Sequence, residues 1–380
     1  MKTVGFLVAL AAGGLIADGW RSFGHRPDAI STRLIDASTR WDGGRFDNPQ
    51  PIVNHMGKYL KDLPNSSKWR TPEASEIPVV SDVAATLAQP PGPSPRVTWM
   101  GHSAVLIEIG GLRVLTDPIW GPVSGPWSWV GPGRYYPPVI SLEALGEVDV
   151  VAISHDHYDH LDRPTIEYLA STRALFLAPL GVGAHLRYWG VPPAQVRELD
   201  WWENVEVGGV RITATPARHA SGRHLFDQNR TLWCGYAIAS DVHRVYFSGD
   251  TGMFPAMKEI GARLGPFDLS MVEVGAYNQG WPDWHLGPEQ AALAARWVQS
   301  KALLPIHWGL FTLASHGWTE PMERVRVAGA ALDLPVWSPR PGQSVTLARP
   351  PAFERWWPDR PWLTAEEDPI ISSQRDGASE

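Results

Sequence analysis

Cysteine, basic clusters and charge in general are scarce in this chain of 380 residues. Its single cysteine, Cys234, excludes an intrachain disulfide and a zinc cluster built on cysteine, and it leaves the redox compartment open. Charged residues make up 19% of the chain, the formal net charge is -7, and no long basic run is present. Because binding to a phosphate backbone depends on clustered lysine and arginine, we expect no nucleic-acid partner.

Long hydrophobic runs are also scarce, but a short one stands near the start of the chain. Residues 4–17 carry no polar side chain, and Lys2 precedes them. A positive start before an apolar stretch resembles a secretory signal or an uncleaved anchor, although the stretch is shorter than a transmembrane helix. We therefore expect residues 1–20 to be a signal or anchor. The protein would then be exported to the periplasmic side or membrane-associated, with a cytoplasmic location as the alternative.

Tryptophan, proline and glycine are abundant instead. The chain has 20 tryptophans, 35 prolines and 36 glycines, and its apolar fraction of 44% is typical of a globular protein. Many of the tryptophans, among them Trp120, Trp127 and Trp129, lie outside periodic segments. Amphipathic rings suit a membrane interface or an apolar ligand groove, and they equally suit packing that anchors loops. The sequence leaves both interpretations open.

Composition and periodicity divide the chain into four segments. After residues 1–20, residues 21–95 are polar, proline-rich and weakly periodic, which indicates an N-terminal extension that wraps a domain. Residues 96–350 carry the strand and helix patterns of the main domain, and residues 351–380 form a C-terminal tail. Within the main domain, residues 121–138 are rich in aromatic residues, proline and glycine, and they predict a long functional loop.

The main domain is predicted to be a layered α/β sandwich. Strands are expected at residues 96–100, 104–109, 112–116, 150–153, 174–178, 210–215, 233–239, 245–247, 269–274 and 302–306, with a Gly110-Gly111 turn between the second and third. Helices are expected at residues 164–170, where Asp162 is the N-cap, and at residues 288–301, which begin with proline. An alternation of strands and helices is typical of a layered α/β fold in one domain.

Four metal-binding side chains follow the apolar strand at residues 150–153 directly. They are His155, His157, Asp159 and His160. Imidazole nitrogen and carboxylate oxygen are the ligands that Zn, Fe or Mn takes in a hydrolytic site. On a turn that leaves a strand, the first two histidines can bind one cation, while the other two residues serve a second cation nearby. The spacing therefore predicts a site for two metal ions.

Three further ligand candidates share one feature, because each follows the end of an apolar strand. They are His219, Asp250 and His307. Strand ends gather at one edge of a layered α/β fold, so we expect these side chains to converge on the histidine cluster. The expected sets are His155, His157 and His219 for one cation, and Asp159, His160 and His307 for the other. Asp250 is expected to be shared, which would offset the repulsion between two cations.

Plainer explanations compete with several of these assignments. His224 is an alternative to His219, Asp250 can be a turn residue or helix N-cap, and His307 can be a satisfied core histidine. Asp117 either braces a ligand histidine or only forms a turn. The remaining candidates, His102, His185, His243 and His316, are taken as structural or as supports of the ligands.

These residues together resemble a known family. The H-x-H-x-D-H run with the later His, Asp and His is similar to the metallo-β-lactamase superfamily. Over roughly residues 40–336 the chain more specifically resembles N-acyl-phosphatidylethanolamine-hydrolysing phospholipase D and its bacterial relatives. The stretches that carry the resemblance include Gly101-His102-Ser103-Ala104, Gly275-Ala276-Tyr277 and Ile306-His307-Trp308-Gly309. The stretches Leu199-Asp200-Trp201-Trp202-Glu203 and Gly265-Pro266-Phe267-Asp268 narrow it to this family.

The resemblance implies a four-layer αβ/βα sandwich, two Zn²⁺ ions and a phosphodiesterase. Such an enzyme acts on phospholipid at a membrane surface and hydrolyses N-acyl-phosphatidylethanolamine to N-acylethanolamine and phosphatidic acid. The resemblance also implies that His285 belongs to the active site, and we count a homodimer among the expected partners. Two features depart from the family. The apolar N-terminus is not a feature of the animal enzymes, and the loop at residues 220–228 differs, where substrate selectivity can change.

The resulting hypothesis is that a hydroxide bridging the two metal ions attacks phosphorus. Asp159 would orient that hydroxide, and His285 would hold the phosphate or protonate the leaving alkoxide. Tyr158 and Tyr277 are the candidate substrate-binding residues. Tyr158 and the tryptophan-rich loop would line an acyl-chain groove; the alternative is that these side chains only pack against the protein. The alternatives are a lactonase or another metallohydrolase, including a nuclease, on the same site, and a non-catalytic metal-binding protein of the envelope.

Overall fold

The computed structural model describes residues 19–53 and 55–373. The expected signal or anchor therefore lies almost entirely outside the described residues, as do the last seven residues of the tail. Within the described ranges, no helix combines the length and the apolar character needed to cross a membrane.

Two sheets form the centre of the molecule. The first sheet has the order β13 (Ser344–Thr346), β1 (Arg96–Gly101), β2 (Ala104–Ile109), β3 (Leu112–Thr116), β4 (Val150–Ala152), β5 (Leu175–Pro179) and β6 (Val196–Leu199). The second sheet has the order β12 (Leu303–Ile306), β11 (Leu269–Glu273), β10 (Arg244–Phe247), β9 (Gly235–Ala239), β8 (Val210–Thr215) and β7 (Asn204–Val207).

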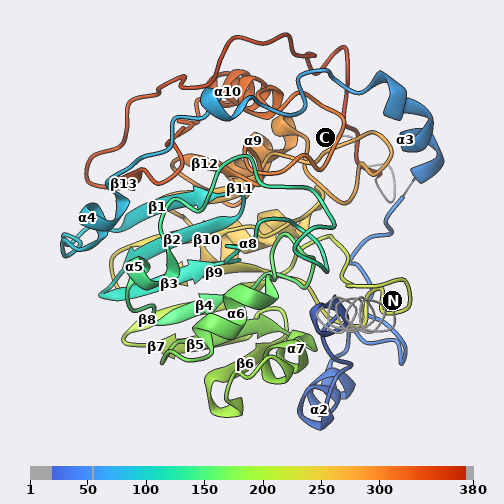
Figure 1. The fold of residues 1–380 in the computed structure, drawn as a ribbon, viewed down its shortest axis with the longest axis vertical. Coiled ribbons are helices and arrows are strands. Elements are labelled where there is room, and N and C mark those ends of the chain that lie inside the picture. Colours follow the sequence, from blue (N-terminus) through green and yellow to red (C-terminus); the bar gives the residue numbers. More distant parts are fainter. Residues whose placement is uncertain (1–18, 54, 374–380) are drawn as a thin grey trace, which may run out of the picture.

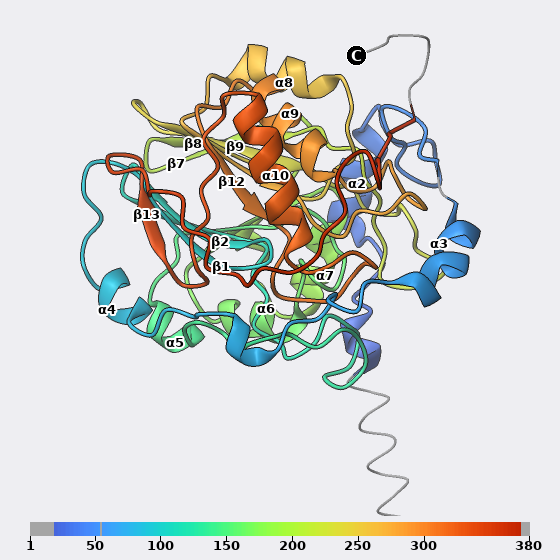
Figure 2. The same ribbon diagram turned by 90° about the horizontal axis from the view of Figure 1, so that it is seen from above.

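Helices cover the outer faces of both sheets (Figures 1 and 2). Those of the main domain are α5 (Leu142–Leu145), α6 (Arg163–Leu169), α7 (Val182–Tyr188), α8 (Ala256–Leu264), α9 (Pro288–Trp297) and α10 (Glu320–Ala331), with a 3₁₀ turn at Pro193–Gln195. The N-terminal extension adds α2 (Ala29–Ala37), α3 (Met56–Asp62) and α4 (Val83–Leu87), with 3₁₀ turns at Leu63–Asn65 and Ala74–Glu76.

Alternation along β2 shows how the layers pack. Val105 and Ile107 lie in the core between the two sheets, whereas Leu106 belongs to the core under α4, α5, α6 and α7. Successive side chains of a strand point to opposite faces, so a strand that is apolar at every position must be covered on both sides. On the far side, Met257 of α8 and Met322 of α10 join the core of the second sheet. The four-layer sandwich predicted from the sequence is confirmed.

Strand direction places several chain segments at one edge. In the first sheet β3, β4, β5 and β6 are parallel, and β1 runs with them because β1 and β3 are both antiparallel to β2. In the second sheet β10, β11 and β12 are parallel, and β8 runs with them because β8 and β10 are both antiparallel to β9. The segments that follow β1, β3, β4, β8, β10 and β12 therefore leave from the same edge of their sheets.

The expected elements are present with small shifts of their ends. Asp162 caps α6 by accepting a hydrogen bond from the backbone N of Thr165, as predicted. The predicted helix at residues 288–301 is too long, because α9 ends at Trp297. Gln299 has a φ of 62°, a left-handed conformation that ends a helix and turns the chain toward β12.

The N-terminal extension and the tail both pack on the main domain. Phe46 is fully buried, and its backbone N donates to Asn229 O at 2.8 Å. In the tail, Trp357 is buried and donates through Nε1 to the Glu323 carboxylate of α10 at 2.7 Å. These contacts fit the wrapping predicted for the extension; the four segment boundaries stay a prediction.

Candidate metal centre

The histidine cluster begins where β4 ends, and buried hydrogen bonds fix its first residues. Ser154 donates through its backbone N to Asp117 Oδ1 at 2.7 Å, and its hydroxyl donates to Asp117 Oδ2 at 2.6 Å. Its hydroxyl oxygen also lies 2.9 Å from His155 Nδ1. Because Nδ1 of His155 is engaged on this side, its Nε2 is the nitrogen that faces the other histidines.

A first group of ligand atoms comes from three histidines. His155 Nε2 lies 2.9 Å from His157 Nδ1, and His219 Nε2 lies 3.3 Å from the same atom. All three imidazoles can offer a nitrogen to one ion. Burial lowers the pKa of all three, which keeps them in the neutral form that binds metal. His219, and not its competitor His224, therefore joins the cluster.

A second group lies beside the first and contains Asp159, His160 and His307. Asp159 Oδ2 is 3.5 Å from His160 Nε2 and 3.4 Å from His307 Nε2. Burial would raise the pKa of Asp159, but the neighbouring His160, His102 and His307 outweigh it and hold the pKa well below its ordinary value. The carboxylate is therefore ionised and available to a cation.

Asp250 stands between the two groups. Its Oδ2 is 3.1 Å from His160 Nε2 and from His307 Nε2. The same oxygen is 3.8 Å from His155 Nε2 and 3.7 Å from His219 Nε2. One carboxylate oxygen in reach of both groups has the position expected of a shared ligand. Gly249 makes this approach possible, since its φ is 56° and a Cβ there would lie 2.6 Å from Ser154 Cβ.

Unpaired buried atoms test whether this donor set fits metal ions. His160 Nε2, both ring nitrogens of His307 and Asp250 Oδ1 are buried and have no hydrogen-bond partner. The short distances from His160 and His307 to Asp250 therefore lack hydrogen-bond alignment. Buried polar atoms are rarely left unpaired, and nitrogen and carboxylate donors that converge in this way suit divalent cations such as zinc. The residues fit two metal ions.

Two further residues hold the ligands in place. Asp117 Oδ2 is 2.7 Å from His160 Nδ1, so this carboxylate supports ligands of both groups, His155 through Ser154 and His160 directly. The sequence left two roles open for Asp117, support of a ligand histidine or a plain turn. The geometry favours the support of a ligand histidine. His102 Nε2 lies 3.0 Å from Asp159 Oδ2, and burial lowers the pKa of His102 to about 3. A neutral imidazole can donate to Asp159 and orient it.

His285 lies beside the cluster, with its Nδ1 3.8 Å from Asp250 Oδ2. Its side chain is 14% exposed, whereas those of the ligand histidines His160 and His307 are fully buried. Its Nδ1 is 2.7 Å from Glu273 Oε2. Glu273 is the last residue of β11 and is itself fully buried, and its other oxygen accepts from the backbone N of Thr251 at 2.5 Å. Glu273 is a functional candidate that the sequence analysis missed.

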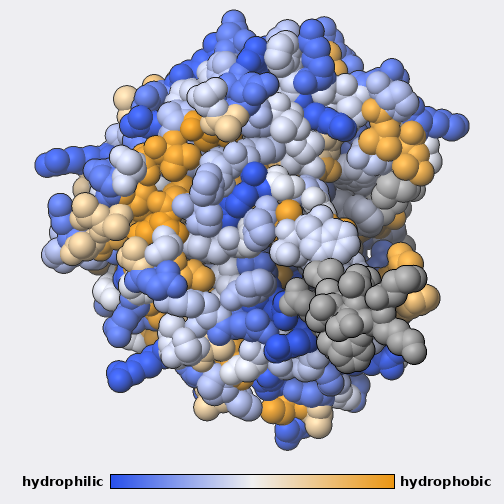
Figure 3. Space-filling view, in the orientation of Figure 1, coloured by the Kyte–Doolittle hydropathy of each residue, from blue (hydrophilic) through white to orange (hydrophobic). Residues whose placement is uncertain are grey.

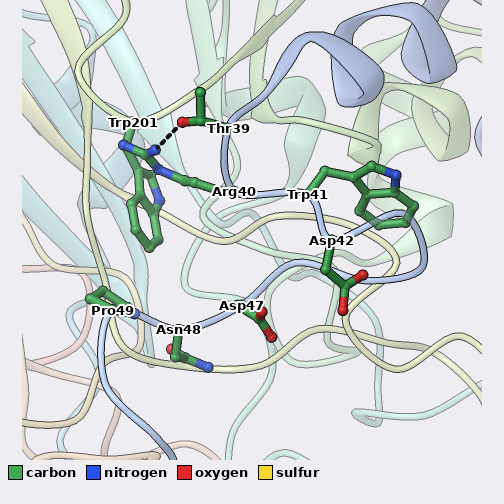
Figure 4. A pocket seen from close by; sticks show the side chains of 8 residues that line it. All are labelled: Thr39, Arg40, Trp41, Asp42, Asp47, Asn48, Pro49 and Trp201. Atoms are coloured by element: carbon green, nitrogen blue, oxygen red, sulfur yellow. Dashed lines mark hydrogen bonds between the residues drawn. The ribbon is translucent and has the colours of Figure 1, made fainter.

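Asn48 of the N-terminal extension holds the backbone of His219. Its Nδ2 donates to His219 O at 2.7 Å, and its Oδ1 accepts from His219 N at 2.9 Å. Asn48 also lines a cavity of about 320 Å³ together with Arg40 and Trp201 (Figure 4). Arg40 covers the ring of Trp201 at 4.6 Å, and none of the metal-ligand candidates lines this cavity. The N-terminal extension thus supports the metal centre by holding the backbone of His219.

The two candidate substrate-binding tyrosines have different surroundings. Tyr158 lies among the ligands in sequence, and its hydroxyl donates to Arg223 O at 2.8 Å. Tyr277 is buried, and its hydroxyl donates to Glu320 Oε1 at 2.6 Å while its ring stacks on His316. Neither hydroxyl faces the ligand atoms described above, and the substrate-binding role of both residues stays a prediction.

The remaining candidate histidines lie outside the donor groups. Of these, His185 contacts the metal-binding loop, with its Nε2 3.4 Å from Asp156 Oδ2. His185 accepts a hydrogen bond from His25 N, and His243 pairs with Asp268 at 3.2 Å. His316 accepts from Ala276 N at 3.2 Å. Trp308, which follows His307, stacks on Trp99 at 5.3 Å within a larger group of tryptophans, so for this residue the packing interpretation applies.

The fold, the edge location and the clustered donors define a metal-dependent hydrolase, and comparison with known families agrees. The family described as "Beta-lactamase superfamily domain" matches residues 112–308. The chain belongs to the metallo-β-lactamase superfamily.

The chain is also similar to several individual proteins. The chain is 49% identical over 265 residues to an "Uncharacterized protein" of Mycobacterium tuberculosis (strain H37Rv), covering 69% of this chain and 71% of the relative. It is 35% identical over 242 residues to "N-acyl-phosphatidylethanolamine-hydrolyzing phospholipase D 1" of Caenorhabditis elegans, covering 60% and 68%. Among solved structures, a metallo hydrolase of Ignicoccus hospitalis is 25% identical with a TM-score of 0.52, covering 67% and 98%.

Proposed function

We propose that this hydrolase cleaves the phosphodiester bond of phospholipids. The proposed reaction converts N-acyl-phosphatidylethanolamine to N-acylethanolamine and phosphatidic acid. The observation that carries the proposal is the shared Asp250 between two groups of donors, with His285 beside it. The 35% identity to a nematode enzyme named for this reaction supports the choice of substrate.

The proposed cofactors are two zinc ions, with iron or manganese as alternatives for the same donors. His155, His157 and His219 would hold one ion, Asp159, His160 and His307 the other, and Asp250 both. Ions bound there would activate water and neutralise charge on the phosphoryl oxygens.

The protein's own residues have distinct tasks in this proposal. Asp159, which His102 orients, would position the attacking water through its carboxylate. His285 would protonate the leaving alkoxide or hold the phosphate, and Glu273 would fix its ring through the contact at Nδ1. Because Glu273 binds Nδ1, the opposite nitrogen of His285 remains for the substrate.

A phospholipid substrate sets the expected location and partners of the protein. We propose that the protein works at a membrane surface, on the exported side if residues 1–20 act as a signal or anchor, and that nucleic acid is not a substrate. A homodimer stays a prediction.

A lactonase is the second candidate function, because the same donor set can activate water toward a lactone carbonyl. The two reactions differ in the atom attacked. Hydrolysis of the phospholipid in H₂¹⁸O tests the first reaction, because the label enters phosphatidic acid if water attacks phosphorus and N-acylethanolamine if it attacks the ethanolamine carbon. The lactone substrate tests the second reaction.

The test uses purified full-length protein with its metal content measured. Three substrates are compared: N-acyl-phosphatidylethanolamine in vesicles, bis(4-nitrophenyl) phosphate and an acyl lactone. We expect turnover of the lipid with ¹⁸O in phosphatidic acid, slower turnover of the aryl diester and none of the lactone. Preferential hydrolysis of the lactone would replace the proposal with a lactonase. A fully metallated protein that cleaves none of the three would support the non-catalytic alternative.

A further inference from the structure

Exposed apolar side chains gather on three segments that are far apart in the sequence. Trp20 is 69% exposed, Trp129 in the tryptophan-rich loop is 64% exposed, and Leu225 and Phe226 in the loop after His219 are 91% and 84% exposed. With the half-buried Phe23 and Trp127 we call these residues the aromatic platform.

Ring contacts join the three segments into one surface. Phe23 lies 6.1 Å from Trp20 and 5.8 Å from Trp127, measured between ring centroids. Trp127 in turn lies 6.1 Å from Trp129. His224 connects the third segment, with its ring 6.0 Å from Phe23 and 6.3 Å from Phe226. In Figures 1 and 2 the start of the described chain and the tryptophan-rich loop lie side by side.

The tip of the third segment is held in a fixed turn. Asp227 accepts hydrogen bonds from the backbone N of Arg223 and of His224, at 3.1 and 2.9 Å. This turn places Leu225 and Phe226 at its outer end. In Figure 3, hydrophobic residues lie at the right of the view, over the loop that lies beside the label N in Figure 1. Two large apolar side chains held open to water at a loop tip indicate an interaction site.

The platform is attached directly to the metal-binding loop. Arg223 is buried, and it donates through Nε to Ser22 O and through Nη1 to Leu161 O, at 2.7 and 2.9 Å. Tyr158, between two ligand candidates in sequence, donates to Arg223 O. One arginine therefore ties the start of the described chain and the loop tip to the loop that carries His157 and Asp159.

The surroundings of the platform favour a lipid bilayer as its occupant. Tryptophan and phenylalanine prefer the interface between water and acyl chains, and none of the six platform residues is charged. The described chain starts at Gly19, where a Cβ would clash with the Trp127 ring, and the apolar residues 4–17 precede it in the sequence. A bilayer can accept both the apolar run and the platform, which a soluble partner would have to cover separately.

We propose that the aromatic platform docks this protein on the surface of a phospholipid bilayer, with Leu225 and Phe226 entering the interface. The inference deepens the proposed function and rests on it, since a site for phospholipids needs access to the bilayer that holds them. Docking through this surface brings the metal-binding loop next to the lipid headgroups. Because the contact is apolar, binding should change little between low and high salt.

The test compares full-length variants on vesicles of phosphatidylcholine. Leu225→Asp combined with Phe226→Asp removes the apolar tip. Val242→Asp is the matched control, because Val242 is 79% exposed in the turn between β9 and β10, at the edge opposite Asp250. Partitioning is measured by co-sedimentation with vesicles, and turnover of bis(4-nitrophenyl) phosphate reports on the intact metal site.

We expect the double variant to partition at least about tenfold more weakly and to keep its turnover of the soluble diester, while the control behaves as the wild type. Equal partitioning of wild type and double variant would overturn the proposal, as would an equal loss in the control. A double variant that only loses self-association in analytical ultracentrifugation would show a second copy as the occupant.

The same samples separate this inference from the proposed function. Weaker partitioning of the double variant without any cleavage of N-acyl-phosphatidylethanolamine by the wild type would support the platform and reject the phospholipase. Cleavage by the wild type with unchanged partitioning of the double variant would do the reverse.

Discussion

Two hairpin turns at the edge opposite the metal centre use left-handed backbone only at glycine, whereas the metal edge also uses it at His102, Asp117 and His307. In the two hairpin turns opposite the metal centre, the positive φ angles fall on the pairs Gly110-Gly111 and Gly208-Gly209. At the metal edge, His102, Asp117 and His307 adopt φ angles of 53°, 34° and 63°. Glycine takes this conformation without steric cost, whereas other residues keep it only where the surrounding structure holds them there.

This difference separates residues that shape the fold from residues that serve the site. The glycine turns connect strands and need no side chain, so they are formed by the residue with the lowest steric cost at positive φ. His102 and Asp117 support expected ligands, and His307 is itself an expected ligand. The surrounding structure holds all three in a strained backbone. Positive φ alone does not mark function, because Gln299 before β12 also adopts it. The three metal-edge residues combine it with a side chain at the donor cluster.

The largest effect is expected at the metal edge itself. Replacing Asp250 with Asn removes the charge that both donor groups share. We therefore expect the variant to lose its metal ions and its turnover to fall at least about a thousandfold. Metal content and hydrolysis of bis(4-nitrophenyl) phosphate are measured together. Asp241→Asn, in the exposed turn of the opposite edge, is the control and should match the wild type. Full activity of the Asp250 variant would remove Asp250 from the site.

A smaller loss is expected where a residue only supports the ligands. Asp117→Asn weakens the hold on His160 and Ser154, and we expect metal affinity to fall about 10- to 100-fold. Competition with a chelator measures the affinity. Asp268→Asn is the control, since Asp268 precedes β11 at the opposite edge and binds Lys301 at 2.7 Å. Unchanged metal affinity in the Asp117 variant would reduce Asp117 to a turn residue.

Glu273 tests the proposed role of His285. Glu273→Gln keeps the size of the side chain but removes its charge, so the His285 ring loses its ionic partner. We expect kcat for N-acyl-phosphatidylethanolamine to fall about 10- to 100-fold, with little change in KM or metal content. The nitrophenyl diester, whose leaving group needs no protonation, should lose little. An equal loss on both substrates would show that Glu273 acts only on the structure; Glu259→Gln on α8 is the control.

The smallest effect is expected in the glycine turns. Gly111→Ala has free space for its Cβ, so its cost is the left-handed backbone alone, about 1–2 kcal/mol of unfolding free energy. Gly133→Ala, which also has open space but no positive φ, should be close to neutral. Urea unfolding measures both variants, and their hydrolytic activity should equal that of the wild type. A Gly111 variant as stable as the wild type would contradict the strain argument.

The strands and the main ligand candidates could be predicted because one pattern repeats. An apolar run followed by His or Asp occurs after β4, β8, β10 and β12, and those four strands run in the same direction. The same pattern occurs at His102 after β1, but one histidine without neighbouring ligand candidates does not indicate a metal site. His285 entered only through the family resemblance.

Elements whose burial depends on charge were missed. Helix α10 buries Glu320, Glu323 and Arg324 in ion pairs, so its apolar periodicity is weak. Glu273 was overlooked for a related reason, because a lone acidic residue in an apolar strand is a signal only once a partner is known. His285 is twelve residues away in sequence, and its contact depends on the loop between β11 and α9.

The central claim is that two groups of ligands share Asp250 and hold two metal ions. The direct measurement is anomalous diffraction from crystals of the full-length protein grown with zinc. We predict two anomalous peaks, one about 2.0–2.1 Å from nitrogens of His155, His157 and His219, and one at similar distances from His160, His307 and Asp159, with Asp250 bound to both. A single peak, or two peaks without a shared Asp250, would contradict the account.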